Sequence, residues 1–454
     1  MKWPPYSVYK PSGVEWLGDV PEGWEVKRGR FCMDVNPRSK RLRELRPEDE
    51  VSFVPMEAVG EYGGIFLGQT RTISDVGSGY TEFDEGDVVV AKITPCFENG
   101  KGALAAGLFN GAAFGTTELH VLRVSSDLDR RFLFYFTISR PFRQTGEGEM
   151  YGAGGQKRVP PEFCENFPFP LPSTDEQTAI ADFLDRETGK IDTLVAKNRT
   201  LIERLKEKRS ALISRTVTRG LPPDEARKAG LDPHPRLKPS GVEWLGDVPE
   251  GWETCPLKYF ATIKTGYAFS SDDFTEEGTP ILRIGDITHD GQIDFSNAKY
   301  LPNSYNAKHR DVLVKYGDIV MAMTGATIGK AGRFMFDEPA LLNQRVCIFR
   351  PLNQNDQSCL WYILNTNFYV EHINLTAFGG AQPNISDSEL LDCFIPVPTP
   401  PEQTAIADFL DRETAKIDKL IAKIEAAIER LREYRTALIT AAVTGKIDVR
   451  GAAS

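Results

Sequence analysis

Two segments of this sequence occur twice, and this repeat limits the folds that the chain can adopt. The segment KPSGVEWLGDVPEGWE occupies residues 10–25 and again residues 238–253. A second segment, EQTAIADFLDRET, occupies residues 176–188 and again residues 402–414. In both cases the copies lie about half the chain length apart. Because self-similarity at a fixed period is typical of duplicated folding units, we expect one fold to occur twice. The segments at 10–25 and 238–253 are called the lead segments below.

Between the repeated segments, the two halves differ in sequence but keep short matches in the same order. Residues 86–89 (GDVV) match residues 317–320 (GDIV), and residues 154–156 (GGQ) match residues 379–382 (GGAQ). Short β-forming runs alternate there with turns rich in Gly, Pro and Asn, which predicts mixed α+β domains. Drift after duplication would erode all regions alike. Identical helices beside divergent middles therefore favour two shared scaffolds that carry different surfaces.

Apolar residues spaced alternately three and four apart follow each second repeat and predict two long helices. This spacing is typical of helices that pair in a coiled coil. The first helix has Asn198 where the second has Ile424, and such polar positions favour pairing between the two copies. A helix that lies on its own domain is the alternative. The predicted pairing positions are Ile191, Leu194, Asn198, Leu201, Leu205, Leu212, Ile417, Leu420, Ile424, Leu431, Tyr434 and Leu438.

The predicted architecture is therefore α+β, with two similar domains alternating with two long helices. A proline-rich stretch separates the halves and is typical of a linker. The last residues are expected to fray. The predicted segments are residues 1–172 (first domain), 173–218 (first helix), 219–238 (linker), 239–398 (second domain), 399–445 (second helix) and 446–454 (tail).

Charge and composition exclude several classes of protein. The chain has 54 Lys and Arg against 64 Asp and Glu, a net charge of −10, so it does not coat nucleic acid by bulk charge. We expect the acidity to lie on the helices and lead segments, and any basic face to be local. The sequence has no signal-peptide pattern and no apolar run long enough to span a membrane. Seven cysteines without a CxxC pair favour reduced thiols in the cytoplasm.

Three motifs that look like catalytic sequences fail on chemical grounds. Residues 325–331 (GATIGKA) have too few residues between the glycines for a phosphate loop and lack the Ser or Thr that ligates magnesium. Residues 3–6 (WPPY) place a hydrogen-bond donor where an adenine methyltransferase needs an acceptor. Lys27, which could belong to a nuclease site, is replaced by Cys255 in the second copy. The five histidines lack metal-ligand spacing, so we expect no catalytic and no metal-binding residues.

The order domain–helix–domain–helix, with its GVEWLGDVPEGW lead and EQ-x-x-IA-x-x-L helix start, resembles the specificity subunits of type I restriction–modification enzymes. So do residues 93–101 (ITPCFENGK), 325–330 (GATIGK) and 379–385 (GGAQPNI). The resemblance covers essentially the whole chain. It implies two target-recognition domains, each of which binds one half of a bipartite, asymmetric DNA site. It also implies an intrachain antiparallel coiled coil with pseudo-two-fold symmetry, which sets the spacing and docks two methyltransferase (M) subunits.

The resemblance further implies that this chain is a non-catalytic, DNA-binding subunit of a cytoplasmic restriction system. The complex would be an N6-adenine DNA methyltransferase and, with restriction (R) subunits, an ATP-dependent endonuclease. S-adenosylmethionine, ATP and Mg²⁺ would then bind the partner subunits. The alternative function is a protein–protein scaffold built on a coiled coil, without DNA binding. A self-contained nuclease or methyltransferase would need a cofactor loop that the sequence lacks.

Recognition of a half-site requires side chains that bond base edges and groups that anchor phosphates. Gly-rich turns help because their backbone amides can approach phosphates closely. Solvated loops are the alternative for each residue, and the first domain lacks the Pro-Asn that follows the Gly-rich turn of the second. The candidates in the first half are Arg38, Lys40, Arg41, Arg43, Arg46, Asn99, Lys101, Gln156, Lys157 and Arg158. Those in the second half are Lys330, Asn343, Gln344, Arg345, Gln382 and Asn384.

Overall fold

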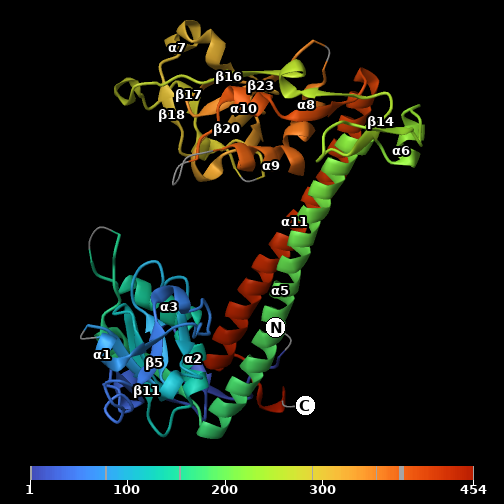
Figure 1. The fold of residues 1–454 in the computed structure, drawn as a ribbon. Helices are drawn as coiled ribbons and strands as arrows, with labels where there is room; N and C mark the ends of the chain where they lie inside the picture. The colour runs from blue at the N-terminus through green and yellow to red at the C-terminus, as the bar shows by residue number, and fades with distance from the viewer. Residues whose placement is uncertain are drawn as a thin grey trace. The chain divides into compact units, whose positions relative to one another are not determined.

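A computed structural model describes residues 3–76, 79–152, 155–288, 290–353, 355–377 and 383–452. The chain forms two compact units (Figure 1). Unit 1 comprises Met1–Arg199 and Glu425–Ser454, and unit 2 comprises Thr200–Ile424. The long helices α5 (Thr174–Arg219) and α11 (Pro400–Val443) each contribute to both units. Each unit therefore contains residues from both halves of the sequence.

Unit 1 contains two four-stranded sheets. The first is antiparallel, in the order β4 (Met33–Val35), β11 (Leu119–Val124), β8 (Val88–Ala91) and β9 (Gly102–Leu104). The second has the order β6 (Thr70–Thr72), β5 (Glu50–Val54), β10 (Ala112–Gly115) and β7 (Thr81–Asp84), with β5 and β10 parallel. The remaining elements are β1 (Tyr9–Pro11), β2 (Asp19–Pro21), β3 (Glu25–Arg28), α1 (Ile73–Val76), α2 (Arg130–Thr137), α3 (Arg140–Gly148), α4 (Pro161–Asn166) and β12 (Pro168–Leu171).

The core of unit 1 explains why these segments form these elements. All four residues of β8 (VVVA) are buried, because the strand is paired on both edges and covered on both faces. A strand in that position has a continuous apolar sequence instead of an alternating one. One face of the sheet packs against phenylalanines of α2, α3 and β12, and the rings of Phe136 and Phe169 lie 4.3 Å apart. Aromatic edge-to-face packing of this kind anchors the helices on the sheet.

Unit 2 repeats this topology strand for strand, which confirms the prediction of one α+β fold in two copies. Its first sheet has the order β16 (Ala261–Thr265), β23 (Val346–Pro351), β20 (Ile319–Ala322) and β21 (Ala331–Arg333). Its second has the order β18 (Lys299–Leu301), β17 (Thr279–Leu282), β22 (Ala340–Leu342) and β19 (Leu313–Val314), with β17 and β22 parallel. The remaining elements are α6 (Pro223–Lys228), β13 (Leu237–Pro239), β14 (Asp247–Pro249), β15 (Glu253–Pro256), α7 (Ser304–Lys308), α8 (Gln357–Leu364), α9 (Asn367–Thr376), α10 (Asp387–Leu391) and β24 (Phe394–Val397).

Helices α5 and α11 lie side by side and run antiparallel (Figure 1). In unit 1, Arg435 Nε donates to Asp192 Oδ1 over 3.2 Å. In unit 2, Arg209 Nε donates to Asp418 Oδ1 over 2.9 Å. The repeat places Asp192 at the position of Asp418 and Arg209 at the position of Arg435. The two ion pairs are therefore pseudo-two-fold mates, and the predicted intrachain antiparallel coiled coil is confirmed.

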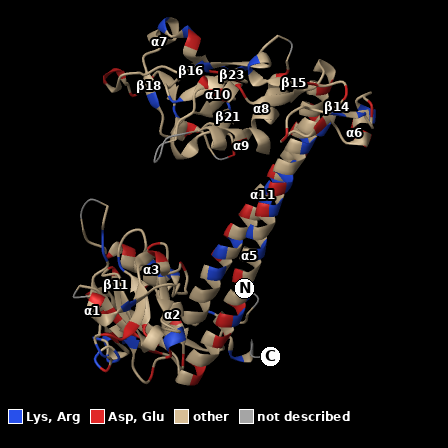
Figure 2. Cartoon of the chain, in the orientation of Figure 1, with Lys and Arg blue, Asp and Glu red and all other residues tan. Residues whose placement is uncertain are grey.

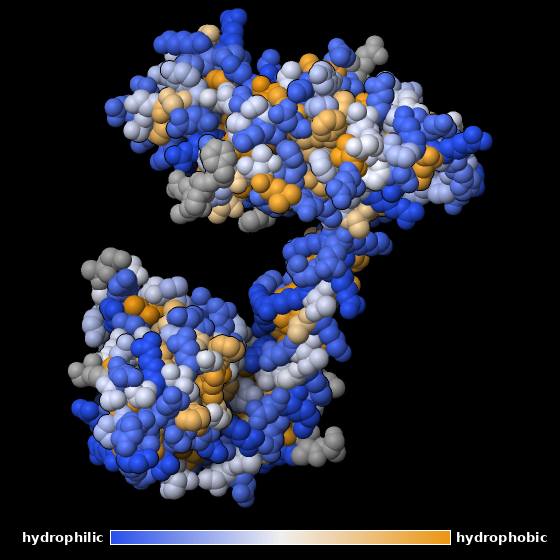
Figure 3. All heavy atoms as spheres, viewed as in Figure 1, coloured by the Kyte–Doolittle hydropathy of each residue, from blue (hydrophilic) through white to orange (hydrophobic). Residues whose placement is uncertain are grey.

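Four of the twelve predicted pairing positions need a correction, whereas the other eight are buried or half-buried. Leu194, Leu201, Leu420 and Tyr434 are exposed, by 49%, 43%, 44% and 45%. Of the residues one position later, Ile202 and Arg435 are buried, and Val195 and Ile421 are half-buried. The sequence left both phases open, because each of the first three misassigned leucines is followed by Val or Ile. Figure 3 shows apolar side chains exposed among hydrophilic ones along the helix pair.

The buried face of each helix is set where the helix begins. In α5, Ile180, Leu184 and Thr188 are buried against unit 1, and Ile191 continues that face. A helical repeat of 3.6 residues then carries the face to Val195, which is half-buried, and not to Leu194. Contacts between helix and domain therefore decided the phase, which the apolar spacing alone did not.

The segment after α11 is packed and does not fray as predicted. Ile447 and Val449 are 3% and 2% exposed. Lys446 Nζ donates to the backbone carbonyls of Leu17 and Asp19 over 2.9 and 2.6 Å. Helix α11 ends at Val443, and Gly445, just beyond it, has a φ of +71°, which suits glycine after a helix C-terminus. The end of the second repeat thus packs against the first lead segment within unit 1.

The acidity lies on the lead segments as expected, with one Lys against four Asp and Glu in each copy, but it does not lie on the helices. Helix α5 carries ten Lys and Arg against eight Asp and Glu, and α11 carries seven against eight (Figure 2). Residues 254–399 of unit 2 carry eleven against sixteen and hold about half of the net negative charge. No described helix is long and apolar enough to cross a membrane.

Candidate DNA interface

Three loops of unit 1 meet at one edge of the β4–β11–β8–β9 sheet. The Thr94 amide donates to the Lys157 carbonyl over 3.0 Å. The amide of Lys92 donates to the Glu118 carbonyl over 2.9 Å, and the amide of Val159 donates to the Lys92 carbonyl over 2.8 Å. We call residues 93–101, 116–118 and 155–159 the first loop cluster. It brings together five of the candidates: Asn99, Lys101, Gln156, Lys157 and Arg158.

The five candidates of the first loop cluster divide into two groups. Asn99, Gln156 and Lys157 are exposed. Arg158 donates through Nε and Nη2 to both carboxylate oxygens of Glu118, over 2.9 and 2.7 Å, and these bonds hold the pKa of Glu118 below its usual range. Lys101 Nζ donates to the Met56 carbonyl over 3.1 Å. Two of the cations thus hold loops together, while the two amides and Lys157 face solvent.

The basic stretch at residues 38–46 lies between β4 and β5, outside the first loop cluster. Arg41 donates to the Asn110 carbonyl and pairs with Glu44, and Arg46 pairs with Glu48 and Asp49. No hydrogen bond or ion pair between described residues joins residues 40–46 to the first loop cluster. The structure therefore does not gather Lys40, Arg41, Arg43 and Arg46 with the other candidates of unit 1.

Arg38 is the member of the basic stretch that shares a groove with Lys92. Its side chain is 78% exposed and lies 3.5 Å from Glu82. It lines a groove together with Asn36, Tyr80 and Lys92, and Lys92 directly precedes the first loop cluster. Lys92 and Asn36 were not among the sequence candidates, because each lies directly after a strand without a Gly-rich turn to mark it.

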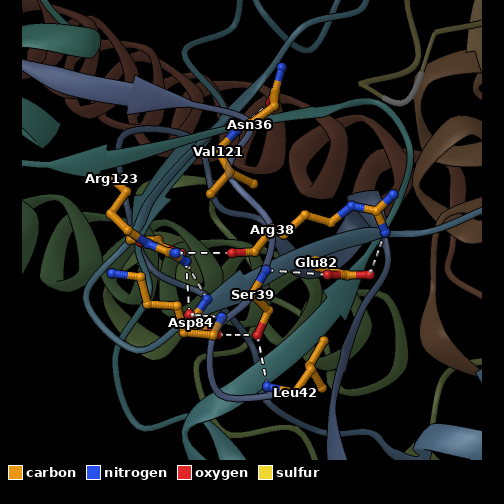
Figure 4. A network of polar contacts seen from close by, with 10 residues as sticks. Asn36, Arg38, Ser39, Leu42, Glu82, Asp84, Val121 and Arg123 are labelled. Carbon is orange, nitrogen blue, oxygen red and sulfur yellow. Dashed lines mark hydrogen bonds and ion pairs between the residues drawn. The ribbon is translucent and has the colours of Figure 1, made fainter. Parts of the chain in front are cut away.

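A network of buried charges fixes the backbone beside Arg38 (Figure 4). Arg123 donates to Asp87 over 2.6 Å, to Asp84 over 2.8 Å and to the Arg38 carbonyl over 3.1 Å. Ser39 in turn donates to Asp84. The bonds to Asp87 hold the pKa of the Arg123 guanidinium above its usual value. The backbone at Arg38 is therefore held firmly in place.

Unit 2 has an equivalent set of loops. The Gly325 amide donates to the Pro383 carbonyl over 2.9 Å, and the Met323 amide donates to the Arg345 carbonyl over 3.0 Å. Residues 323–330, 343–345 and 383–385 form the second loop cluster. Gln344, Arg345 and Asn384 are exposed there, whereas Lys330 and Asn343 are half-buried. Gln382, with Gly379, Gly380 and Ala381, lies outside the described residues.

An aromatic cluster lies beside the second loop cluster. The ring of His309 lies 4.6 Å from that of Tyr267, 5.3 Å from that of Phe269 and 5.6 Å from that of Tyr305. Tyr267 is 50% exposed and pairs through its backbone with Asn343. The sequence gives no sign of this cluster, because ring contacts between residues some forty positions apart leave no local pattern.

Tyr267 is held against the second loop cluster by its neighbour in the chain. A Cβ on Gly266 would overlap the Asn343 carbonyl oxygen, so this close backbone approach requires glycine. The Gly266 amide donates to the Val346 carbonyl over 3.0 Å. A glycine followed by an exposed aromatic residue is the sequence feature that could have drawn attention to this position.

The comparisons with known proteins agree with this architecture. Residues 65–204 and 249–430 match the family model described as type I restriction modification DNA specificity domain. The chain belongs to this family. The resemblance seen in the sequence is confirmed, and with it the predictions of a DNA-recognising, non-catalytic subunit of a restriction–modification system.

Curated relatives cover nearly the whole chain. The specificity subunit of the type I restriction enzyme EcoAI from Escherichia coli is 29% identical over 94% of this chain and 83% of its own length. That of MjaVIII from Methanocaldococcus jannaschii is 26% identical over 95% of this chain and 94% of its own. A chain solved in work on complex assembly and conformational transition of the type I R-M system superposes with a TM-score of 0.64 at 18% identity, over 94% of this chain and 99% of that one.

Proposed function

We propose that each loop cluster binds one half of a bipartite, asymmetric double-stranded DNA target, and that the helix pair sets the spacing between the halves. The observation that carries this proposal is that equivalent loops, at the same sheet edge of two matching folds, present different side chains. Exposed amides such as Asn99 and Gln156, or Gln344 and Asn384, can donate to and accept from base edges. Recognition of two different half-site sequences requires different side chains in the two loop clusters. The exposed cations among the other candidates, such as Lys40, Arg43, Lys157 and Arg345, belong to the proposal as a periphery that contacts phosphates.

We further propose that the recognition domains are residues 1–172 and 239–398, and that two M subunits, and then R subunits, assemble on this chain in the cytoplasm. Identical lead segments and helix starts support two copies of one partner, because identical surfaces bind identical proteins. Phe31 and Tyr259 stand at equivalent positions of the two units and are 71% and 65% exposed. S-adenosylmethionine, ATP and Mg²⁺ then belong to the partners.

The net charge of −10 sets the expected affinity of the isolated chain. Affinity for DNA comes largely from phosphate contacts that release counterions. An acidic chain with few free cations in its loop clusters gains little from this effect. We therefore expect weak DNA binding by the chain alone and strong binding by the complex with M subunits.

The test is to map methylation in a host that lacks DNA methylation. The chain is co-expressed with its methyltransferase subunit, formation of the complex is verified, and the genome is sequenced for N6-methyladenine. A split motif that disappears without this chain is the expected result. A complex that forms but methylates nothing would favour the scaffold function instead.

Two changes to the chain test whether each recognition domain reads one half-site and whether the helices set the spacing. Exchange of residues 254–395 for those of another family member should alter one half of the motif, and a change in both halves would contradict it. Matched insertions of four residues after Lys197 and after Lys423, which occupy equivalent positions, should lengthen the spacer by about 6 Å at 1.5 Å per residue and leave both halves unchanged.

A further inference from the structure

Arg435 of α11 connects the helix pair to a turn of unit 1. Its side chain is 8% exposed, and Nε donates to Asp192 Oδ1 over 3.2 Å. Its Nη2 donates to the Tyr62 carbonyl over 3.1 Å, and the guanidinium carbon lies 5.3 Å from the centre of the Tyr62 ring. Arg435 comes from the second half of the sequence, whereas Tyr62 and Asp192 come from the first. One side chain therefore joins α5, α11 and a loop of the first recognition domain.

The turn that Arg435 contacts has an unusual backbone. Tyr62 has a φ of +63°, a left-handed conformation that side chains rarely adopt and that persists only where neighbours enforce it. Gly63 and Gly64 follow it with φ values of +120° and +85°. The bond from Arg435 to the Tyr62 carbonyl and the cation–π contact with its ring both act on the residue that carries the strain. Such outliers gather at sites where geometry matters for function.

The same turn supports the first loop cluster. The Tyr62 amide donates to the Gly100 carbonyl over 3.2 Å, and the Gly102 amide donates to the Gly60 carbonyl over 3.3 Å. The Tyr62 ring lies 3.3 Å from the position that a Cβ on Gly100 would occupy. Gly100 lies between Asn99 and Lys101. Any shift of the turn therefore moves the loop that presents Asn99.

A second arginine fixes this loop from its own unit. Arg143 of α3 is buried, and its Nη1 donates to the Phe97 carbonyl over 2.8 Å. Its guanidinium carbon lies 4.6 Å from the centre of the Phe97 ring. The loop is thus held between Arg143 on one side and the turn at Tyr62 on the other. The turn at Tyr62 is the one of these two supports that Arg435 contacts.

We propose that Arg435 is a positioning residue that fixes the reading loop of the first recognition domain to the register of the helix pair. The bases accepted in the first half-site then depend on a helix encoded in the second half of the sequence. This rests on the proposed function, in which the loop at Asn99 contacts DNA. The pseudo-two-fold mate Arg209 supplies a matched control, because it forms the equivalent ion pair with Asp418 in unit 2.

The first test does not involve DNA and uses hydrogen exchange of the full-length chain. In Arg435→Met, amides of residues 59–65 and 97–102 should exchange about tenfold faster than in the wild type, whereas Arg209→Met should leave both segments unchanged. Unchanged exchange in Arg435→Met would overturn the proposal, and so would equal acceleration by Arg209→Met. If Arg435→Met fails to fold, Arg435→Lys replaces it, because one ammonium group cannot reproduce the fork of bonds to Asp192 and Tyr62. Wild-type exchange in Arg435→Lys would likewise overturn the proposal.

The second test uses the methylation map of the complex with M subunits. Arg435→Met should raise methylation at sites with one changed base in the first half about threefold relative to cognate sites, and leave the second half strict. Arg209→Met should not relax the first half. A first half that stays strict, or two halves that relax equally, would overturn the proposal. If the wild-type complex yields no split motif, the proposed function fails, and hydrogen exchange alone decides whether Arg435 positions the loop.

Discussion

Units 1 and 2 share their strand order but hold their loop clusters by different chemistry. In unit 1, Arg158 pairs with Glu118, and buried Arg143 bonds backbone carbonyls of the loop after β8. In unit 2, Ile373 packs directly against Gly329, and the loop after β20 thus rests on an apolar side chain. Backbone hydrogen bonds join equivalent loops in both units. The same backbone fold can therefore hold its loops with different side-chain contacts.

The parts that the units share lie where each long helix begins. Gln177 and Gln403 each accept from a backbone amide and each donate to a proline carbonyl over 2.9 Å. Tyr135 donates to Asp185 over 2.7 Å, and Tyr362 donates to Asp411 over 2.5 Å. Burial raises the pKa of both tyrosines. These bonds account for the Gln and Asp that the EQTAIADFLDRET segment has at the same positions in both halves.

The largest effect is expected when the glutamine at the start of either long helix is replaced. Gln177→Leu and Gln403→Leu each leave a buried backbone amide and carbonyl without partners, which costs about 2–3 kcal/mol. We expect equal losses in the two units, measured by urea unfolding with hydrogen exchange resolved by unit. A loss in one unit alone would show that the two anchors are not equivalent.

Acid should distinguish the units. Burial lowers the pKa of His120 to about 4, and its Nε2 lies 2.9 Å from the Val159 carbonyl, so the neutral ring fits the fold. The equivalent position in β23 is Cys347, a thiol whose pKa is raised by burial. Because the unfolded state of unit 1 takes up the proton first, unit 1 should lose about 1.4 kcal/mol per pH unit between pH 6.5 and pH 4.

The control for this pH dependence is His120→Gln, which cannot titrate. Unfolding of unit 1 in this variant should lose the part of the slope that His120 contributes, while unit 2 behaves as in the wild type. Equal pH slopes in the wild type and the variant would contradict the assignment. The measurement is urea unfolding at several pH values, again resolved by unit.

The aromatic cluster of unit 2 should affect recognition of one DNA half-site and not of the other. Tyr267→Ala should reduce methylation at cognate sites about tenfold, because loss of a base contact costs about 1–3 kcal/mol. Tyr316 is 61% exposed in the same unit and lies outside the cluster, so Tyr316→Ala is the matched control. Only the half-site of unit 2 should become permissive in Tyr267→Ala. A loss of equal size in the control would exclude a specific contact.

The smallest effect is expected on the helix pair. Leu201 is 43% exposed and its neighbour Ile202 is 7% exposed. Leu201→Ser should change the free energy of unfolding by less than about 0.5 kcal/mol, whereas Ile202→Ser should cost about 2 kcal/mol or more. Urea denaturation of the full chain measures both. A larger loss for Leu201→Ser would restore the phase that the sequence spacing suggested.

The repeated segments predicted the fold and the long helices, whereas contacts between distant parts of the chain could not be predicted from the sequence. The two-copy α+β fold, the long helices and their pairing followed from duplicated segments and a regular spacing, and the antiparallel direction followed from the family resemblance. The phase at Leu194 did not, because Val195 is equally apolar and the domain decides which of them is buried. Candidates in Gly-rich turns came together in two clusters, whereas Lys40, Arg41, Arg43 and Arg46 did not join them.

The duplication and the two long helices can be recognised along a single chain from its repeats and periodicity, and the motifs that carry the family resemblance can be recognised there too. Only the tertiary structure decided which charges are free for DNA. Glu118 neutralises Arg158 across 40 positions, and Arg435 reaches Asp192 across 243. Whether a charged side chain is paired or exposed depends on its neighbours in space. Folding brings those neighbours together from distant parts of the chain.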